Sequence, residues 1–207
     1  MTAPFRVALT FDAEHPDRPS RVGAQERLLD LLAADGVRAT FFVQGRWAEA
    51  YPETARVIAD DGHLVGHHSH YHARLPLLTD EGIVEDVRNG ATAIRAATGI
   101  DPAPWFRCPF GAGADDLRVL AAIGSTGYRH VGWHVAADDW DPAHSSAFVA
   151  DAILRGIDAR GDGAVVLLHT WPTATLDAID PILDGLATAD AELCRVDELA
   201  AVPADVS

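Results

Sequence analysis

Short apolar runs alternate along the chain with longer segments in which apolar residues recur every three or four positions. Continuous apolar runs are typical of strands that are buried on both faces, and the longer spacing is typical of amphipathic helices. The pattern therefore predicts about seven strands with helices between them. The predicted strands cover residues 6–12, 37–43, 63–66, 105–108, 128–133, 164–168 and 193–196.

Capping residues and glycines limit the predicted helices. Thr79 is the predicted N-cap of a long helix that ends at Gly99, and Asp115 is the predicted N-cap of a shorter one. Ser145 or Ser146 caps a third helix, whose apolar residues lie on one face. The predicted helices cover residues 24–35, 52–61, 80–98, 116–123, 147–157 and 181–187.

Strands that alternate with helices predict a parallel sheet with right-handed crossover connections. Both a doubly wound sheet and an incomplete barrel fit this alternation. Because the chain has 207 residues and no internal repeat or linker, we expect one domain over residues 1–207.

The composition argues against several kinds of partner. A formal net charge of −15 argues against binding nucleic acid, or an anionic membrane surface, through broad electrostatic attraction. The two cysteines, Cys108 and Cys194, are far apart in sequence and do not indicate a disulfide framework. No apolar run reaches the length of a membrane span, and residues 1–5 lead into the first predicted strand without a signal-peptide pattern. We therefore expect a cytoplasmic protein, although a secreted protein trimmed of its signal would read the same way; the sequence predicts no oligomeric state.

Four imidazoles lie within residues 66–72, at His67, His68, His70 and His72. His68 and His72 are four residues apart, so on a helical turn both rings would point toward one ion. Imidazole pairs with this spacing are a common way to hold a transition metal. The alternative is a solvated, histidine-rich loop, and His67 and His70 are the rival ligands within the stretch.

Further polar residues directly follow the predicted strands, at the end where α/β proteins build their sites. Taken alone, a carboxylate after a strand is often a turn residue, a single arginine is often on the surface, and a single histidine is often part of the core. Their shared position at the ends of five strands favours one functional site. The residues are Asp12, Glu14, His68, His72, Arg107, Asp138, Asp139 and His169.

These residue types suit metal-dependent hydrolysis. A carboxylate beside two histidines would complete a metal site that leaves a position free for water, which is the catalytic arrangement. Two acids near one ion can divide the work, since one binds the ion and the other takes a proton from water. The chain has no GxSxG motif, which argues against a serine esterase of the α/β-hydrolase type, and no HExxH motif, which argues against a zincin protease.

Five motifs between residues 9 and 199 resemble, in the same order, those of the polysaccharide deacetylases, the NodB-homology family of carbohydrate esterases. Residues 10–14 are similar to the first motif, TFDDG, and residues 68–72 match the second, HSxxH. Residues 107–111 are similar to RxPYG, residues 133–140 to the fourth motif, which ends in DW, and residues 167–169 to LxH. The resemblance implies a distorted, incomplete (β/α)7 barrel, and it decides between the two architectures left open by the alternation.

The resemblance also implies an activity and a cofactor. The expected reaction is hydrolysis of an N-acetyl amide or O-acetyl ester of a sugar. Glu14, His68 and His72 would hold a divalent ion, for which Zn²⁺ is the first choice and Co²⁺ or Ni²⁺ would fit the same ligands.

The resemblance assigns roles to the remaining motif residues. Asp12 would act as the base, oriented by Arg107, and His169 would protonate the leaving group. The backbone N–H of Phe110 would bind the oxyanion. The acetyl methyl group would lie against Trp140 and Leu167.

Three positions depart from the family pattern. Ala13 separates the two acids of the first motif, so Glu14 takes the place of the usual second aspartate. Ala136 stands where the family often has the aspartate that tunes the catalytic histidine, so Asp138 or Asp139 is the candidate for that role. Thr170 stands where the family often has aspartate.

Two other functions fit the same motifs. A cytoplasmic location would favour a small soluble amide, formyl or cyclic imide substrate, cleaved by the same metal-dependent chemistry. Altered first and fourth motifs could instead mark an inactive carbohydrate-binding relative, although Asp12, Arg107 and His169 together argue against that reading.

Overall fold

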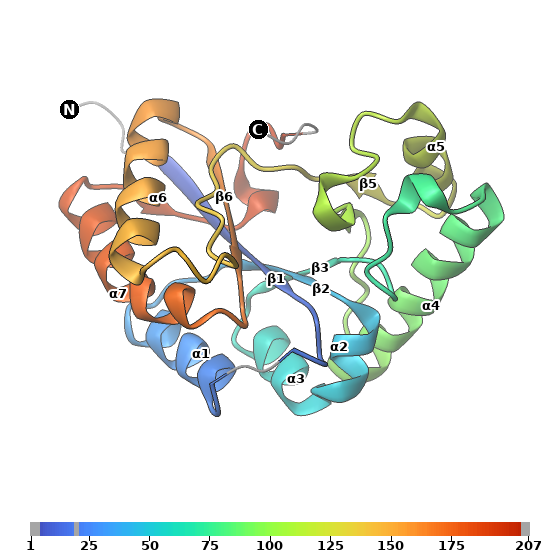
Figure 1. The fold of residues 1–207 in the computed structure, drawn as a ribbon, viewed down its shortest axis with the longest axis horizontal. Coiled ribbons are helices and arrows are strands. Elements are labelled where there is room, and N and C mark those ends of the chain that lie inside the picture. Colours follow the sequence, from blue (N-terminus) through green and yellow to red (C-terminus); the bar gives the residue numbers. More distant parts are fainter. Residues whose placement is uncertain (1–4, 19–20, 204–207) are drawn as a thin grey trace.

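The computed structural model describes residues 5–18 and 21–203, and a curled, all-parallel sheet lies at its centre (Figure 1). The strand order is β5-β4-β3-β2-β1-β6, and β7 pairs with the beginning of β1. This confirms the α/β class and the incomplete barrel expected from the sequence. The strands are β1 (Arg6–Ala13), β2 (Thr40–Val43), β3 (Leu64–His67), β4 (Trp105–Phe106), β5 (Arg129–His130), β6 (Ala164–His169) and β7 (Glu192–Leu193).

Helices surround the curled sheet, with α6 and α7 on one side, α4 and α5 on the other, and α1, α2 and α3 between them (Figure 1). The helices are α1 (Ala24–Ala34), α2 (Gly45–Ala50), α3 (Pro52–Asp60), α4 (Asp80–Thr98), α5 (Leu117–Ser125), α6 (Ser146–Arg160) and α7 (Thr173–Thr188). Short 3₁₀ helices are η1 (Leu75–Leu77), η2 (Pro109–Gly111) and η3 (Val196–Glu198).

A segment after β5 crosses from the β4 edge of the sheet to the β6 edge. Val131 N–H donates to the carbonyl of Phe106 at 2.7 Å, and His134 N–H donates to the carbonyl of Val165 at 2.8 Å. Val135 then forms a parallel bridge with Val166. Among the described residues, a single irregular segment rather than an eighth strand thus spans the open side of the incomplete barrel, between β5 and β6.

Alternation along β1 decides which residues face the interior of the barrel. Val7, Leu9 and Phe11 belong to the large apolar cluster that includes residues of α1, α6 and α7. Ala8 belongs to a smaller cluster with Phe42 of β2 and apolar residues of β4, β6 and η3. Every second residue of β1 therefore points away from the helices, and this direction places its polar residues at the site.

Several predicted limits need correction. Asp116, not Asp115, caps α5, because its carboxylate accepts hydrogen bonds from two backbone N–H groups of the first turn. Ser145 is the N-cap of α6, and Thr79 caps α4 as predicted. Four strands are shorter than the apolar runs that predicted them: β2, β4, β5 and β7 cover only residues 40–43, 105–106, 129–130 and 192–193. Those runs also include residues of the connecting segments, most of them buried, which lie outside the strands themselves.

Two helices also differ from expectation. The sequence did not predict α2, which has only six residues and no side-chain cap. The predicted start of α7 at Pro181 is eight residues too late, because this proline lies inside the helix. Within the described residues, no helix is long and apolar enough to cross a membrane. Residues 1–4, which entered the expectation about the compartment, lie outside the described residues.

Candidate active site

β1 delivers two carboxylates to the carboxyl end of the sheet. Asp12 is the last interior-facing residue of β1, and Glu14 follows the strand directly. Each is 3% exposed, so both carboxylates need partners that replace water. The partners come from the loops after β3, β4 and β6.

The loop after β3 brings His68 and His72 together, but not through a helical turn as the four-residue spacing predicted. Ser69 has φ 60° and His72 has φ 58°, so two residues in left-handed conformation fold the loop tightly. Ser69 Oγ accepts a hydrogen bond from His72 N–H at 2.8 Å and stabilises this turn. The Nε2 atoms of the two rings are 3.1 Å apart.

The two rival histidines point elsewhere. His67 Nδ1 accepts from Ser69 N–H at 2.9 Å, and its Nε2 lies 2.9 Å from the carbonyl oxygen of Val87 in α4. His70 lines a separate cavity between α2 and α4. Neither ring belongs to the group of ligand atoms formed by Glu14, His68 and His72.

Glu14, His68 and His72 form a compact donor set that suits a metal ion. Glu14 Oε2 is 3.1 Å from His68 Nε2 and in direct contact with His72 Nε2. His68 Nδ1 lies 2.9 Å from the carbonyl oxygen of Arg107, which can only accept, so Nδ1 carries the proton and Nε2 presents a lone pair. Lone pairs and a carboxylate oxygen that face one another at these distances repel unless a cation lies between them, so the donors fit a divalent ion.

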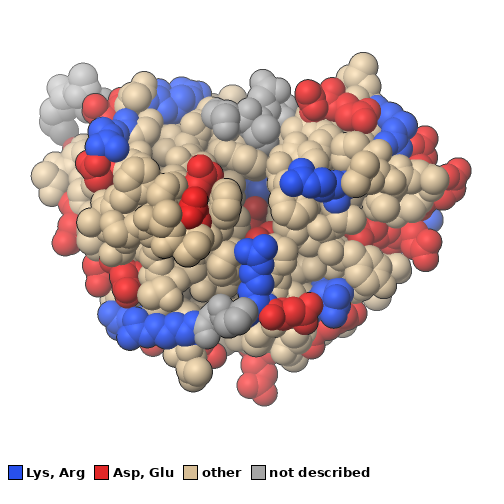
Figure 2. Space-filling view, in the orientation of Figure 1, with Lys and Arg blue, Asp and Glu red and all other residues tan. Residues whose placement is uncertain are grey.

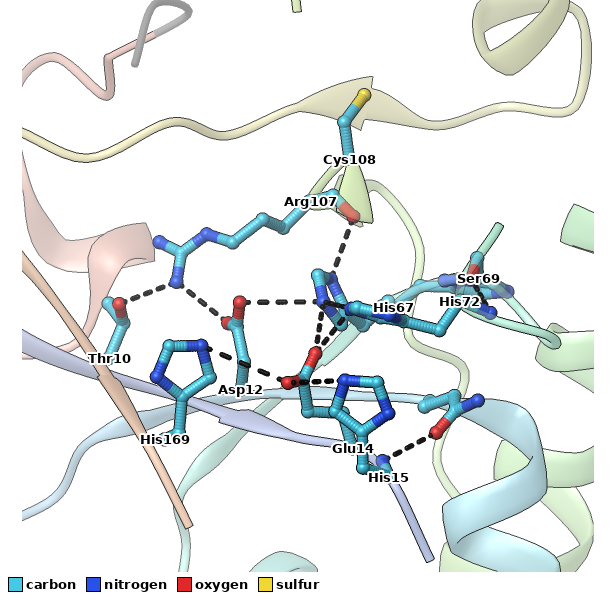
Figure 3. A network of polar contacts seen from close by, with 12 residues as sticks. Thr10, Asp12, Glu14, His15, His67, Ser69, His72, Arg107, Cys108 and His169 are labelled. Atoms are coloured by element: carbon cyan, nitrogen blue, oxygen red, sulfur yellow. Dashed lines mark hydrogen bonds and ion pairs between the residues drawn. The ribbon is translucent and has the colours of Figure 1, made fainter. Parts of the chain in front are cut away.

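Arg107 holds the second carboxylate. Its Nη1 donates to Asp12 Oδ1 at 2.9 Å and to Thr10 Oγ1 at 2.8 Å. The other two nitrogen atoms of the guanidinium, Nε and Nη2, donate to the backbone carbonyls of Val131 and Gly132 in the crossing segment. Figure 3 shows Asp12 between this guanidinium and the Glu14–histidine group, and Asp12 Oδ2 is 3.4 Å from His68 Nε2.

His169, at the end of β6, is held by Asp139. The carboxylate contacts His169 Nδ1 at 2.7 Å and accepts from the His169 backbone N–H at 2.8 Å. Thr175 of α7 donates to the same carboxylate and completes its hydrogen bonding. Of the two candidates for tuning His169, Asp139 makes the contact; Asp138 is exposed and Ala136 has no group that could reach. The free Nε2 of His169 lies 3.9 Å from Glu14 Oε1.

The surroundings set the charge of these groups. Burial disfavours the charged form of His169, but Asp139 outweighs this and, with Glu14 and Asp12, raises its pKa to about 9. Burial would raise the pKa of Glu14, but contacts with His15, His68 and other imidazoles lower it well below the ordinary range. His169 therefore carries its proton at neutral pH, beside a carboxylate that does not.

A cavity of about 460 Å³ opens over these groups. The three residues expected to contact substrate, Phe110, Trp140 and Leu167, all line it. Phe110 has φ 59°, a left-handed conformation that is uncommon for a bulky residue and is typical of functional loops. Cys108 also lines the cavity, but burial raises the pKa of its thiol to about 12, which excludes a nucleophilic thiolate at neutral pH.

Sequence reasoning missed two neighbours of Glu14. His15 Nε2 lies 3.1 Å from Glu14 Oε1, and Trp171 Nε1 donates to the same oxygen at 3.4 Å. Gln44, at the end of β2, accepts from His15 N–H at 2.9 Å. All three residues follow β1, β2 or β6 within two positions, and this was the available signal, because parallel strands bring such residues to one edge.

The comparisons with known proteins agree with this geometry. The polysaccharide deacetylase family model matches residues 2–131. The chain is 34% identical to the chitooligosaccharide deacetylase of Sinorhizobium fredii over 185 residues, which cover 89% of this chain and 77% of that protein. Among solved structures, a family 4 carbohydrate esterase from Streptomyces lividans in complex with acetate matches with a TM-score of 0.78 and 33% identity, over 92% of this chain and 91% of that one.

A further structural relative carries a different description. A family 4 carbohydrate esterase pseudoenzyme from Bacillus anthracis matches with a TM-score of 0.83 and 25% identity, over 96% of this chain and 66% of that one. The family thus includes a member described as inactive, and membership does not by itself decide activity. The extent of the family match and the identity to the chitooligosaccharide deacetylase show that this chain belongs to the polysaccharide deacetylase family.

Proposed function

We propose that this protein is a metal-dependent carbohydrate deacetylase that hydrolyses an N-acetyl amide or O-acetyl ester. One observation carries the proposal: a metal-type donor set, a buried carboxylate–arginine pair and a carboxylate–histidine pair meet at one cavity. These are the three groups that metal-dependent hydrolysis of an acetyl group uses. A solved relative in complex with acetate, the group that deacetylation releases, supports the same reading.

Glu14, His68 and His72 are the proposed ligands of the ion, with Zn²⁺ favoured by two imidazoles and one carboxylate. When bound, such an ion polarises an acyl carbonyl and makes water a stronger acid. His15 and Trp171 contact the other oxygen of Glu14 and keep its Oε2 turned toward the two histidines.

Asp12 is the proposed base. Its Oδ1 is bound by Arg107, whereas Oδ2 faces the ligand histidines and is free to accept a proton from the attacking water. Arg107 fixes the rotation of the carboxylate, because Thr10 and two backbone carbonyls fix the guanidinium in turn.

His169 is the proposed acid. The Asp139 contact at Nδ1 leaves Nε2 facing the cavity, and the raised pKa keeps the imidazole protonated until a leaving amine or alkoxide takes the proton. The Phe110 backbone N–H is the proposed donor to the oxyanion. Trp140 and Leu167 are the proposed contacts of the acetyl methyl group.

The test is acetate release after removal of metal by a chelator. Substrates would include N-acetylglucosamine oligomers, acetylated xylan oligomers, an aryl acetate and small formyl and cyclic imide compounds. We expect release from a sugar only after Zn²⁺ or Co²⁺ is restored. Restored turnover of the small amides alone would favour the amidase, and stoichiometric metal binding with no turnover would favour the inactive binding protein.

Two variants separate binding of the ion from proton transfer. Asp12→Asn should keep a stoichiometric ion and lose turnover by about 10²–10⁴-fold, because the base is lost and the ligands remain. Glu14→Ala should lose the ion, because two imidazoles alone remain to hold it. Elemental analysis after dialysis measures the metal content of both variants. Loss of the ion in Asp12→Asn and its retention in Glu14→Ala would mean that Asp12 is the ligand and Glu14 the base.

A further inference from the structure

Two arginines line the site cavity, and each stacks on an aromatic ring that lines the same cavity. Arg18 Cζ lies 4.6 Å from the centroid of the Trp171 ring, and Arg74 Cζ lies 4.3 Å from the centroid of the Phe110 ring. Both arginines are exposed. Figure 2 shows that this face of the molecule is hollowed near its middle and that basic side chains lie beside the hollow.

These two arginines have no carboxylate partner among the described residues, although the chain is rich in acids. The sequence has 31 acidic and 16 basic residues, and all of the basic ones are arginine. Nine of the arginines lie within 4.0 Å of a carboxylate, but Arg18 and Arg74 are not among them. Within the described residues, no hydrogen bond from either guanidinium is found, so their N–H donors are free for a ligand.

Stacking on a ring prepares a guanidinium to bind an anion. The ring covers one flat face and limits the motion of the side chain, while the N–H groups at the edge of the plane stay open. That edge matches the two oxygens of a carboxylate, with which arginine forms paired, charge-assisted hydrogen bonds. Arg18 and Arg74 therefore present ordered donors at the cavity.

The other charges of the cavity do not compete for these donors. Asp12 and Glu14 are buried and already contact Arg107 and the histidines. Asp138 is the only other carboxylate among the described lining residues, and it is exposed in the segment between β5 and α6. The positive groups come from the loops after β1 and β3, so two loops bring basic side chains to the cavity.

We propose that Arg18 and Arg74 bind a carboxylate on the sugar, so that the substrate is an anionic acetylated carbohydrate. This inference rests on the proposed deacetylase function and narrows its substrate class. The carboxylate could be a lactyl ether substituent or the C6 carboxylate of a uronic acid; both present the same two oxygens to the arginines.

The experiment compares three oligosaccharides in acetate release: neutral N-acetylglucosamine oligomers, N-acetylated glycan strands with free lactyl carboxylates, and acetylated oligouronates. We expect the larger kcat/KM for one of the two anionic substrates, and which one identifies the source of the carboxylate. The Arg18→Gln/Arg74→Gln double variant should raise KM for that substrate by about tenfold or more and leave KM for the neutral oligomers within about twofold. Any change in kcat should be the same for all three substrates, because the arginines stack on Trp171 and Phe110 whatever the charge of the sugar.

Arg56→Gln is the matched control, because Arg56 is an exposed arginine of α3 without an ion pair among the described residues and does not line the cavity. Combined with Arg27→Gln, at an exposed position of α1 that also has no ion pair among the described residues, it changes the net charge as much as the double variant does and should leave every KM unchanged. Preference for the neutral oligomers, or an equal KM increase for all three substrates in the double variant, would overturn the inference while leaving the deacetylase function intact.

A binding measurement separates failure of this inference from failure of the proposed function. Should no substrate release acetate, the deacetylase function fails, and calorimetric titration with unacetylated oligouronates and lactyl-bearing strands still tests the arginines. Binding by the unaltered protein that weakens about tenfold in the double variant supports the carboxylate site. Absence of binding, or equal binding by both proteins, overturns it.

Discussion

At the scale of single residues, Asp139 shows how the chain compensates for a departure from its family pattern. Ala136 cannot tune His169, but Asp139, three residues later, contacts both the Nδ1 atom and the backbone N–H of His169. One carboxylate thus fixes the orientation of the imidazole and supports its positive charge. Asp138, although adjacent and also at the cavity, is exposed and makes no contact with His169 among the described residues.

Asp139→Asn tests this assignment. The substitution keeps the shape of the side chain and removes its charge, so the pKa of His169 should fall from about 9 toward its ordinary range. Because the proposed acid is active when protonated, the alkaline limb of the kcat profile should move to lower pH, with about 10–10²-fold loss of kcat at pH 8. Asp138→Asn is the matched control and should leave the profile in place; an unmoved profile in Asp139→Asn would remove Asp139 from this role.

The motif residues of the site could be predicted from the sequence, whereas the residues that contact them in the folded protein could not. The motif residues lie at the ends of strands or shortly after them, and the common edge of a parallel sheet brings them together. They are Asp12, Glu14, His68, His72, Arg107 and His169. His15 and Trp171 also follow strands, but a histidine and a tryptophan beside motif residues carry no spacing that distinguishes them from core residues. Their contacts with Glu14 depend on side-chain directions that only the folded loops define.

At the scale of elements, the histidine loop depends on α4. The ring of His67 lies between this loop and the helix, bonded to Ser69 N–H and near the carbonyl of Val87. A Cβ atom at Gly90 of α4 would lie 2.7 Å from the His67 ring and 3.0 Å from the Ser69 carbonyl oxygen. The loop can approach the helix this closely because residue 90 has no side chain.

Gly90→Ala should therefore destabilise the protein although alanine favours helices. We expect a loss of about 1–3 kcal/mol in the free energy of unfolding and weaker metal binding, because the loop that carries His68 and His72 must shift. Gly124→Ala in α5 is the matched control, since its Cβ would meet nothing within 4 Å, and it should gain up to about 1 kcal/mol. Urea unfolding and metal titration measure both effects; equal stability changes in the two variants would contradict the contact.

Element limits were predictable where capping residues or glycines define them, as at Thr79 and Gly99 of α4. They were not predictable where tertiary contacts replace local signals. The loop that carries His68 has two residues in the left-handed conformation, Ser69 and His72. Neither serine nor histidine has a strong enough preference for this conformation to predict it from the sequence. The short strands β4 and β5 end early because the residues that follow them continue the pairing with one backbone hydrogen bond each, from Arg107 N–H to the His67 carbonyl and from Val131 N–H to the Phe106 carbonyl.

At the scale of the whole molecule, burial of neutral imidazoles should make stability depend on pH. Burial lowers the pKa of His67 to about 3 and, with the nearby Arg107, that of His130 to about 4. Both lie below the unfolded value of about 6.5, so the unfolded chain binds these protons first as the pH falls. Stability from both residues is present above pH 6.5 and is lost as the pH falls toward 4.

Metal-free protein should therefore lose about 2 kcal/mol of unfolding free energy for each of these imidazoles between pH 7 and pH 5. The contribution of His169 to the free energy of unfolding changes with pH in the opposite direction. Its raised pKa stabilises the folded state as the pH falls below about 9, and the full contribution is present below about pH 6.5. Urea denaturation at the two pH values measures the loss, and NMR titration of the rings shows whether His67 and His130 stay neutral. Constant stability with titrating rings would contradict the prediction.

Arg107 has a consequence for how related sequences are classified. Its four hydrogen bonds join β1 to the crossing segment, with no exposed surface, so the residue holds together parts of the barrel that are distant in sequence. In a descendant that lost its chemistry we expect this arginine to be kept for stability, because removing one partner of a buried ion pair leaves the other unpaired. Its retention in a homologue therefore indicates a shared fold, whereas, under the proposed roles, the joint presence of Glu14 and the Asp139–His169 pair is the better marker of an active enzyme.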